Sequence, residues 1–250
     1  MKKITGTTLF ILMGILIWGA LPVEALSLTP EEILLNLDKK MNLEWSCIMD
    51  FEVITYEGED SHQARVRVYI YDSKRSIATF LAPERFVNDR YLVVGHNTWK
   101  YQEGLRRPIR ISPRQKLFGE AGIAETMGID YYREYKPLGM EEEKEHFILK
   151  LKARDSKTAY QMADLYVSGD SLQIERVILK GVNGEPLKEL IYHNHREMAG
   201  IEVADITVKN LLYERDRKTV LIFKDVKPGD LPEQAFQPLT LDKFRLLIRE

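Results

Sequence analysis

Few side chains in this sequence have the types and spacing that catalysis or metal binding requires. His193 and His195 are the best metal candidates, because residues two apart on a strand share a face and could offer two imidazoles to one ion. No cysteine or third histidine lies near them, which favours a polar, solvent-facing strand end instead. The acidic run 141–143 is interpreted as a solvated turn. We therefore expect no metal site.

Familiar enzyme signatures are also missing. The sequence contains no Gly-x-Ser-x-Gly elbow, no Walker-type phosphate loop, no Gly-x-Gly-x-x-Gly fingerprint and no His-Glu-x-x-His zinc motif. A hydrolase acting on an envelope polymer is therefore disfavoured, and we expect neither catalysis nor a cofactor. The chain has 36 basic and 38 acidic residues, a net charge of -2, so no overall positive field attracts nucleic acid.

One basic cluster stands out. Arg106, Arg107 and Arg110 follow a strand-like segment that contains Trp99 and Tyr101. The simplest interpretation is an exposed hairpin of cations. The functional alternatives are a rim that contacts lipid head groups and a surface that attracts an acidic partner.

The single cysteine, Cys47, excludes an internal disulfide. We interpret it as a small buried residue at the start of a strand, with a reactive thiol as the alternative. Stability must then come from a hydrophobic core, and 44% of the residues are hydrophobic.

The N-terminal segment has the pattern of an export signal. Lys2 and Lys3 precede an apolar stretch, and Val23 and Ala25 are the small residues that a signal peptidase recognises. We predict a signal peptide over residues 1–25 and a mature chain of 26–250. An uncleaved membrane anchor is the alternative. Because no cysteine lies at the cut, the mature protein is not expected to carry a lipid.

The mature chain has mostly the periodicity of β-strands. Thr29 and Glu32 form a capping box that opens one amphipathic helix. Short helices are expected within 116–140 and over 232–236. Without repeats or a shift in composition, residues 26–250 are interpreted as a single domain. Alternating apolar residues predict about a dozen strands in one antiparallel sheet, over residues 47–55, 64–71, 76–81, 91–94, 98–102, 109–112, 146–153, 160–167, 172–179, 187–193, 201–209 and 219–223.

A sheet of this size must curl, because strand twist accumulates from strand to strand. Its concave face is then filled by its own side chains, covered by helices, or open to an apolar ligand. Trp99 and Tyr101 share one strand face, with Phe80 and Leu92 expected on neighbouring strands. These residues alone do not decide between core and cavity lining.

Several short motifs, taken in order, resemble a known family. They are Phe80-Leu81-x-Pro83, Tyr91 to Val94, Trp99-Lys100-Tyr101, Leu105-Arg106-Arg107, Arg110-Ile111-Ser112 and Leu231-Pro232-x-x-x-Phe236. This pattern resembles the LolA-like proteins, the periplasmic family that sorts outer-membrane lipoproteins, from about Thr29 to Phe244. The chain departs from it at Glu103, where the family often has proline, and at 88–90, where it often has glycine.

The resemblance implies a mainly β fold, a strongly curved antiparallel half-barrel of about 11 strands with helices covering the concave face. It also implies a monomeric periplasmic carrier that receives acyl chains of lipoproteins or lipids from an inner-membrane donor and passes them to an outer-membrane acceptor. A lipid-sensing adaptor for a membrane protein complex is the alternative. Arg106, Arg107 and Arg110 become candidates for rim or partner contact. The cavity candidates are Phe51, Val53, Val66, Val68, Phe80, Leu92, Val94, Trp99 and Tyr101.

Overall fold

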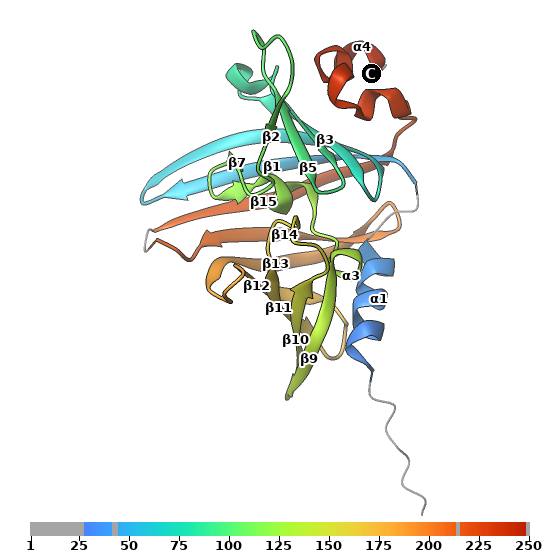
Figure 1. The fold of residues 1–250 in the computed structure, drawn as a ribbon. Coiled ribbons are helices and arrows are strands. Elements are labelled where there is room, and N and C mark those ends of the chain that lie inside the picture. The colour runs from blue at the N-terminus through green and yellow to red at the C-terminus, as the bar shows by residue number, and fades with distance from the viewer. Residues whose placement is uncertain (1–27, 42–44, 214–215, 249–250) are drawn as a thin grey trace, which may run out of the picture.

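A computed structural model describes residues 28–41, 45–213 and 216–248. Its main feature is one 13-stranded antiparallel sheet, drawn in Figure 1. The strand order is β6-β5-β4-β3-β2-β1-β15-β14-β13-β12-β11-β10-β9, so β6 and β9 are its two edges and the sheet does not close into a barrel. The predicted mainly β fold with a large curved antiparallel sheet is confirmed.

The strands are long near the centre of the sheet and short at the β6 edge. The sheet consists of β1 (Cys47–Glu57), β2 (Asp60–Asp72), β3 (Arg75–Ala82), β4 (Arg90–Val94), β5 (Asn97–Tyr101), β6 (Ile109–Ile111), β9 (Tyr135–Glu143), β10 (His146–Ala153), β11 (Met162–Ser168), β12 (Ile174–Lys180), β13 (Pro186–Met198), β14 (Ile201–Asn210) and β15 (Arg217–Pro228). A separate two-stranded ribbon is formed by β7 (Lys116–Phe118) and β8 (Ala121–Gly122).

The helices are short. They are α1 (Pro30–Met41), α2 (Ile123–Met127), α3 (Tyr131–Glu134), α4 (Phe244–Leu247) and the 3-10 helices η1 (Glu84–Phe86), η2 (Glu233–Phe236) and η3 (Pro238–Lys243). Among the described residues, none of these is long and apolar enough to cross a membrane. The predicted signal peptide lies outside the described residues.

The concave face of the sheet is covered by α1, α2 and α3. The predicted capping box is present: the Thr29 N–H donates to Glu32 Oε2 at 2.8 Å, and the Glu32 N–H donates to Thr29 Oγ1 at 3.3 Å. The helix α1 then buries Ile33, Leu34 and Leu37. It contacts α3, β9 and β14, and Figure 1 shows it beside α3. The covering therefore starts with a helix that the local sequence specifies.

The part of the outer face formed by β1 to β5 is covered by the C-terminal segment. Figure 1 shows η2, η3 and α4 on the side of β3 to β5 away from α1. The rings of Phe244 and Tyr69 lie 4.9 Å apart between centroids, and those of Phe236 and Tyr71 lie 5.3 Å apart. Together with Leu92, these side chains belong to a second hydrophobic cluster, distinct from that of the concave face.

The structure corrects the prediction for residues 116–140. The expected short helix is present as α2, but the segment also forms β7 and β8 and enters the edge strand β9. Glu141, Glu142 and Glu143 therefore lie in a strand and not in a turn, and Glu143 pairs with His146. Backbone pairing at an edge tolerates charged side chains, which protect the edge from other strands. A hydrophobic pattern does not reveal such a strand.

Candidate ligand-binding cavity

A cavity of about 580 Å³ lies between the concave face and the three helices that cover it. This volume is within the range of about 300–1,000 Å³ that is typical of small-molecule sites. The apolar part of the lining comes from both halves of the sheet and from the helices. It includes Leu34, Leu37, Met41, Met49, Phe51, Val68, Ile70, Val93, Ile123, Met127, Ile129, Leu190, Ile201, Val203, Ile206 and Phe223.

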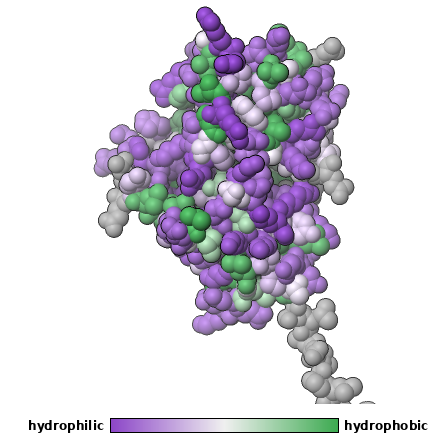
Figure 2. All heavy atoms as spheres, in the orientation of Figure 1, coloured by the Kyte–Doolittle hydropathy of each residue, from purple (hydrophilic) through white to green (hydrophobic). Residues whose placement is uncertain are grey.

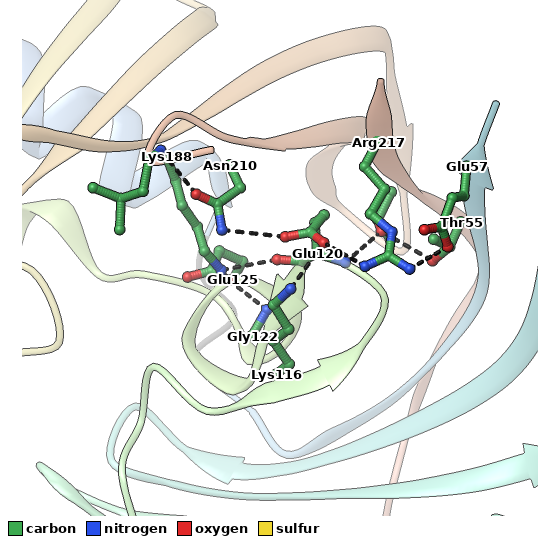
Figure 3. A network of polar contacts seen from close by, with 11 residues as sticks. Thr55, Glu57, Lys116, Glu120, Gly122, Glu125, Lys188, Asn210 and Arg217 are labelled. Atoms are coloured by element: carbon green, nitrogen blue, oxygen red, sulfur yellow. Dashed lines mark hydrogen bonds and ion pairs between the residues drawn. The ribbon is translucent and has the colours of Figure 1, made fainter. Parts of the chain in front are cut away.

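The covering next to this cavity is held by buried polar contacts, shown in Figure 3. Lys188 Nζ lies 2.6 Å from Glu125 Oε2, and the two side chains are only 9% and 0% exposed. Lys188 Nζ also donates to the Glu120 carbonyl at 2.9 Å. The Tyr160 hydroxyl donates to Glu125 Oε1, and the Gly122 N–H donates to its Oε2. These contacts join α2 and the β7–β8 ribbon to strand β13.

A second group of contacts fixes the turn of the ribbon against the centre of the sheet. The Glu120 N–H donates to Thr219 Oγ1 at 2.7 Å, and Thr219 Oγ1 lies 3.0 Å from Thr55 Oγ1. Gly119 has a φ of +58°, and a Cβ there would collide with both threonine hydroxyls. Glycine is therefore required for both its backbone conformation and the close approach.

The carboxylate of Glu120 is also paired. Burial raises its pKa, but Lys116 Nζ at 2.8 Å, Asn210 Nδ2 at 3.3 Å and Arg217 Nη1 at 3.8 Å outweigh burial and hold the pKa below its usual value. The ion pairs and hydrogen bonds therefore keep this buried group charged.

The helix α3 gives the cavity an acidic side. Asp130 caps the helix by accepting the Arg133 N–H at 2.9 Å, and its Oδ2 lies 3.2 Å from Arg133 Nη1. Glu134 lines the same cavity and has no ion pair or side-chain hydrogen bond among the described residues. Burial, and next the charge of Asp130, raise the pKa of Glu134 to about 7. Burial also raises the pKa of Asp130.

Several hydroxyl groups interrupt the apolar lining, among them those of Tyr131, Tyr192 and Thr98. The hydroxyl oxygens of Tyr131 and Tyr192 lie 3.3 Å apart. Burial is the main cause that raises the pKa of both phenols, that of Tyr192 to about 12, so both remain protonated. On β5, Thr98 lines the cavity with a side chain whose Oγ1 has no hydrogen-bond partner among the described residues.

The predicted cavity residues divide into three groups. Phe51 and Val68 line the cavity. Val53, Val66 and Phe80 belong to the same concave-face core but do not line it.

The prediction is wrong for the third group, Leu92, Val94, Trp99 and Tyr101, which lie on the outer face with the C-terminal helices. The register pairs Leu92 with Trp99 and Val93 with Thr98. Because successive side chains point to opposite faces, the cavity receives Val93 and Thr98.

Sequence reasoning also missed the contributions of α1 and α3 and of Ile206 and Phe223. The amphipathic pattern of α1 was visible, but nothing local shows that its apolar side faces a hollow. The alternation of β4 and β5 was visible too. It fixes which residues share a face and leaves open which face is concave.

The remaining candidates lie away from the cavity lining. Arg106, Arg107 and Arg110 are exposed around β6, Arg110 donates to Asn97, and none of the three lines the cavity. Their role in partner contact stays a prediction. Cys47 is buried as the first residue of β1, and burial raises the pKa of its thiol to about 12.

The two histidines contact different neighbours. His193 Nε2 lies 2.9 Å from Thr207 Oγ1, and His195 Nδ1 lies 2.8 Å from Glu202 Oε1. Asn194 between them has a φ of +51°, where the pairing of β13 with β14 is interrupted. Within the part of the chain that the structure describes, no three His, Cys, Asp or Glu side chains are grouped to hold a metal ion.

The outside of the molecule is largely hydrophilic. Figure 2 shows polar side chains over most of the visible face, with hydrophobic ones in separate patches. Large exposed apolar side chains include Leu138 on β9, Leu239 on η3, Leu246 on α4, and Leu212 and Tyr213 in the connection between β14 and β15. Single exposed apolar residues are normal on protein surfaces and do not by themselves mark a binding site.

The curved sheet with its helical covering is similar in fold to solved proteins of the LolA superfamily. A LolA superfamily protein from Nitrosomonas europaea is similar, with a TM-score of 0.76 and 22% identity, covering 84% of this chain and 98% of that one. An outer membrane lipoprotein-sorting protein domain from Vibrio parahaemolyticus has a TM-score of 0.67 at 18% identity, covering 83% and 95%. A DUF1329 family protein from Desulfovibrio piger has a TM-score of 0.69 at 16% identity, covering 83% and 95%.

These likenesses confirm the resemblance at the level of the fold. A protein-family model described as "Uncharacterized protein" matches residues 72–243, and the chain belongs to that family. No curated protein matches the chain.

Proposed function

We propose that this protein is a non-enzymatic periplasmic carrier that holds acyl chains of lipoproteins or lipids in its concave cavity and transfers them toward the outer membrane. The observation that carries the proposal is the cavity of about 580 Å³ with apolar lining from α1, both halves of the sheet and α2. Each methylene group that leaves water gains about 0.8 kcal/mol. An acyl chain therefore needs such a shelter to cross an aqueous compartment.

The location and direction of transfer rest on two further arguments. The pattern of residues 1–25 predicts export, and the similar Vibrio domain is described as an outer membrane lipoprotein-sorting protein. The sequence predicts export without a lipid anchor, which suits a carrier that moves between two membranes. Release then requires an acceptor with a better site or a change in the covering of the cavity.

The experiment uses the mature protein, purified from a periplasmic extract without detergent. Native mass spectrometry followed by lipid extraction should find a bound acyl species. The purified protein should also take a fluorescent phospholipid from self-quenched vesicles, seen as a rise in fluorescence. A protein that is empty and extracts no lipid would contradict the carrier proposal.

A pair of neighbouring variants tests whether the cavity is the binding site. Val93 and Val94 are adjacent half-buried residues of β4, and only Val93 lines the cavity. Val93→Lys should weaken lipid uptake at least about tenfold, equivalent to about 1.4 kcal/mol, because it places a charge among apolar side chains. Val94→Lys, on the outer face, should leave uptake unchanged. Equal effects of the two variants would argue against this cavity.

A further inference from the structure

The hydroxyl pair in the cavity has a hydrogen-bond donor to spare. Tyr131 is 6% exposed, and its hydroxyl lies 3.3 Å from that of Tyr192, a long distance for two hydroxyls. One tyrosine can donate to the other, and the second proton then has no acceptor among the described residues. Tyr131 and Tyr192 both line the cavity. The site therefore offers an O–H donor to a ligand atom.

A second hydroxyl lies on the part of the lining that β5 contributes. Thr98 is 1% exposed and lines the cavity, and its Oγ1 is buried without a partner, so it meets a ligand atom once the side chain rotates about χ1. Leaving a buried hydroxyl unsatisfied costs about 1–3 kcal/mol. A purely hydrocarbon ligand would satisfy neither this group nor the tyrosine pair. An uncharged ligand with an oxygen acceptor would satisfy at least one of them.

The charges around the cavity are unfavourable for an anion. Asp38, Asp130 and Glu134 line it. The carboxylate of Asp130 interacts electrostatically with that of Asp38 and with that of Glu134. Asp130 is paired with Arg133, while Glu134 is half-buried and lacks a counter-ion among the described residues. An incoming carboxylate would add a like charge to this acidic side.

The cations that line the cavity are paired or exposed. Arg75 contacts Asp72 and Glu233, both at 2.6 Å. His96 lies 3.7 Å from Asp155. Arg133 pairs with Asp130 at 3.2 Å. The remaining two, Lys74 and Lys157, are exposed to solvent, where an ion pair contributes little. No buried cation in the described lining offsets the carboxylates.

We propose that the cavity selects acyl chains in uncharged, esterified form over free fatty acids. The carbonyl oxygen of an ester accepts a hydrogen bond from the Tyr131–Tyr192 pair or from Thr98, and the carboxylates of α3 disfavour the anionic head of a free acid. This inference rests on the proposed function and specifies the chemical class of its ligand. No bond is made or broken in the process.

The test compares three ligands with the same chain, lauric acid, methyl laurate and dodecane, each competing with a fluorescent lipid held by the protein. The measurements are made at about pH 8, where both lauric acid and Glu134 are ionised. Methyl laurate should bind tightest. The inference would be overturned if lauric acid bound as tightly as methyl laurate or more tightly.

An ester is more hydrophobic than an ionised acid and would bind an apolar cavity better without any specific contact. Two variants distinguish that effect from the proposed selection. The double variant Tyr131→Phe with Tyr192→Phe keeps the rings and removes the hydroxyls. It should lower the affinity for methyl laurate about 2–10-fold relative to the affinity for dodecane. Glu134→Gln should raise the affinity for lauric acid several-fold and leave the affinity for methyl laurate unchanged. If both variants keep the wild-type order and spacing of affinities, the inference is wrong even though lipid binding stands.

A third variant guards against a folding defect in the double tyrosine variant. Thr98→Val is nearly isosteric and removes the unsatisfied hydroxyl, so the empty protein should be as stable as the wild type or more stable. If Thr98 holds the ester carbonyl, this variant should lower the affinity for methyl laurate and leave the affinity for dodecane unchanged. Failure of the wild type to bind any of the three ligands would overturn the proposed function itself.

Discussion

The concave face of the sheet and the part of the outer face formed by β1 to β5 are both apolar and both covered by helices, yet the covering of the concave face leaves a cavity of about 580 Å³. On the outer face, η2, η3 and α4 insert Phe236 and Phe244 against Tyr71 and Tyr69, and the aromatic rings fill the space. On the concave face, Leu34, Leu37 and Met41 of α1 line the cavity together with strand residues such as Phe51 and Val68, and the space between them stays open. An apolar strand face is therefore not by itself evidence for a cavity.

The two coverings are also held differently. The outer one is attached by hydrophobic packing around Leu92 and Phe244, with polar contacts such as Arg75–Glu233 at its exposed margin. The β7–β8 ribbon and α2, on the concave side, are attached by the buried ion pair of Lys188 with Glu125 and by hydrogen bonds (Figure 3). Directional polar contacts fix the position of a covering without filling the space beneath it.

The largest expected effect breaks the polar attachment. Lys188→Met removes the cation and leaves Glu125 buried with an uncompensated charge, so the free energy of unfolding should fall by about 3–5 kcal/mol. Urea unfolding followed by tryptophan fluorescence measures the loss. The double variant Lys188→Met with Glu125→Gln should recover part of it. A single variant as stable as the wild type would show that the ion pair does not hold the covering.

The next effect separates the two faces at neighbouring positions of β4. Leu92→Ala creates a void in the filled outer cluster, where Leu92 is 0% exposed, and should cost about 2–5 kcal/mol of stability. The lipid affinity of the folded protein should stay the same. Val93→Ala, next to the existing cavity, should cost less. Reduced lipid affinity in Leu92→Ala would place the ligand, or a route to it, on the outer face.

The smallest effect concerns the acidic side of the cavity. The pKa of Glu134 is about 7 in the folded protein against an ordinary value of 4.5, so the folded state binds more protons between these pH values. The stabilising contribution is complete below about pH 4.5 and is lost as the pH rises through 7. Because water reaches Glu134, we expect a loss on the order of 1 kcal/mol.

Glu134→Gln should remove this part of the pH dependence, measured as the free energy of unfolding at a series of pH values. Glu31→Gln, at an exposed position of α1, serves as the control and should keep the wild-type profile. If Glu134→Gln loses stability in parallel with the wild type over this interval, the group is not held protonated by its surroundings.

Much of the fold was predictable because its signals are local. Alternation along β1 and β2 gave two strands with Phe51 and Val68 on the concave side, and the Thr29–Glu32 capping box gave the start of α1. The edge strand β9 was missed because pairing at an edge requires backbone groups and not apolar side chains.

The site was less predictable, as Trp99 illustrates. The strand that contains Trp99 was predicted correctly. Its side chain, however, packs on the outer face near Leu92, and Thr98 faces the cavity instead. The alternation of side chains along a strand determines which residues share a face. The choice of face depends on the register from β1 to β5 and on where residues 231–248 pack.

The alternating strands, the opening helix and the lack of familiar catalytic motifs follow from residues that are close in the sequence, and the resemblance to LolA-like proteins follows from the order of short motifs along it. The folded structure was needed to show that the outer face at β1 to β5 is filled, that the concave face holds a cavity, and that Tyr131, Tyr192 and Glu134 line it. Those outcomes depend on how the sheet curves and on side chains brought together from distant parts of the chain.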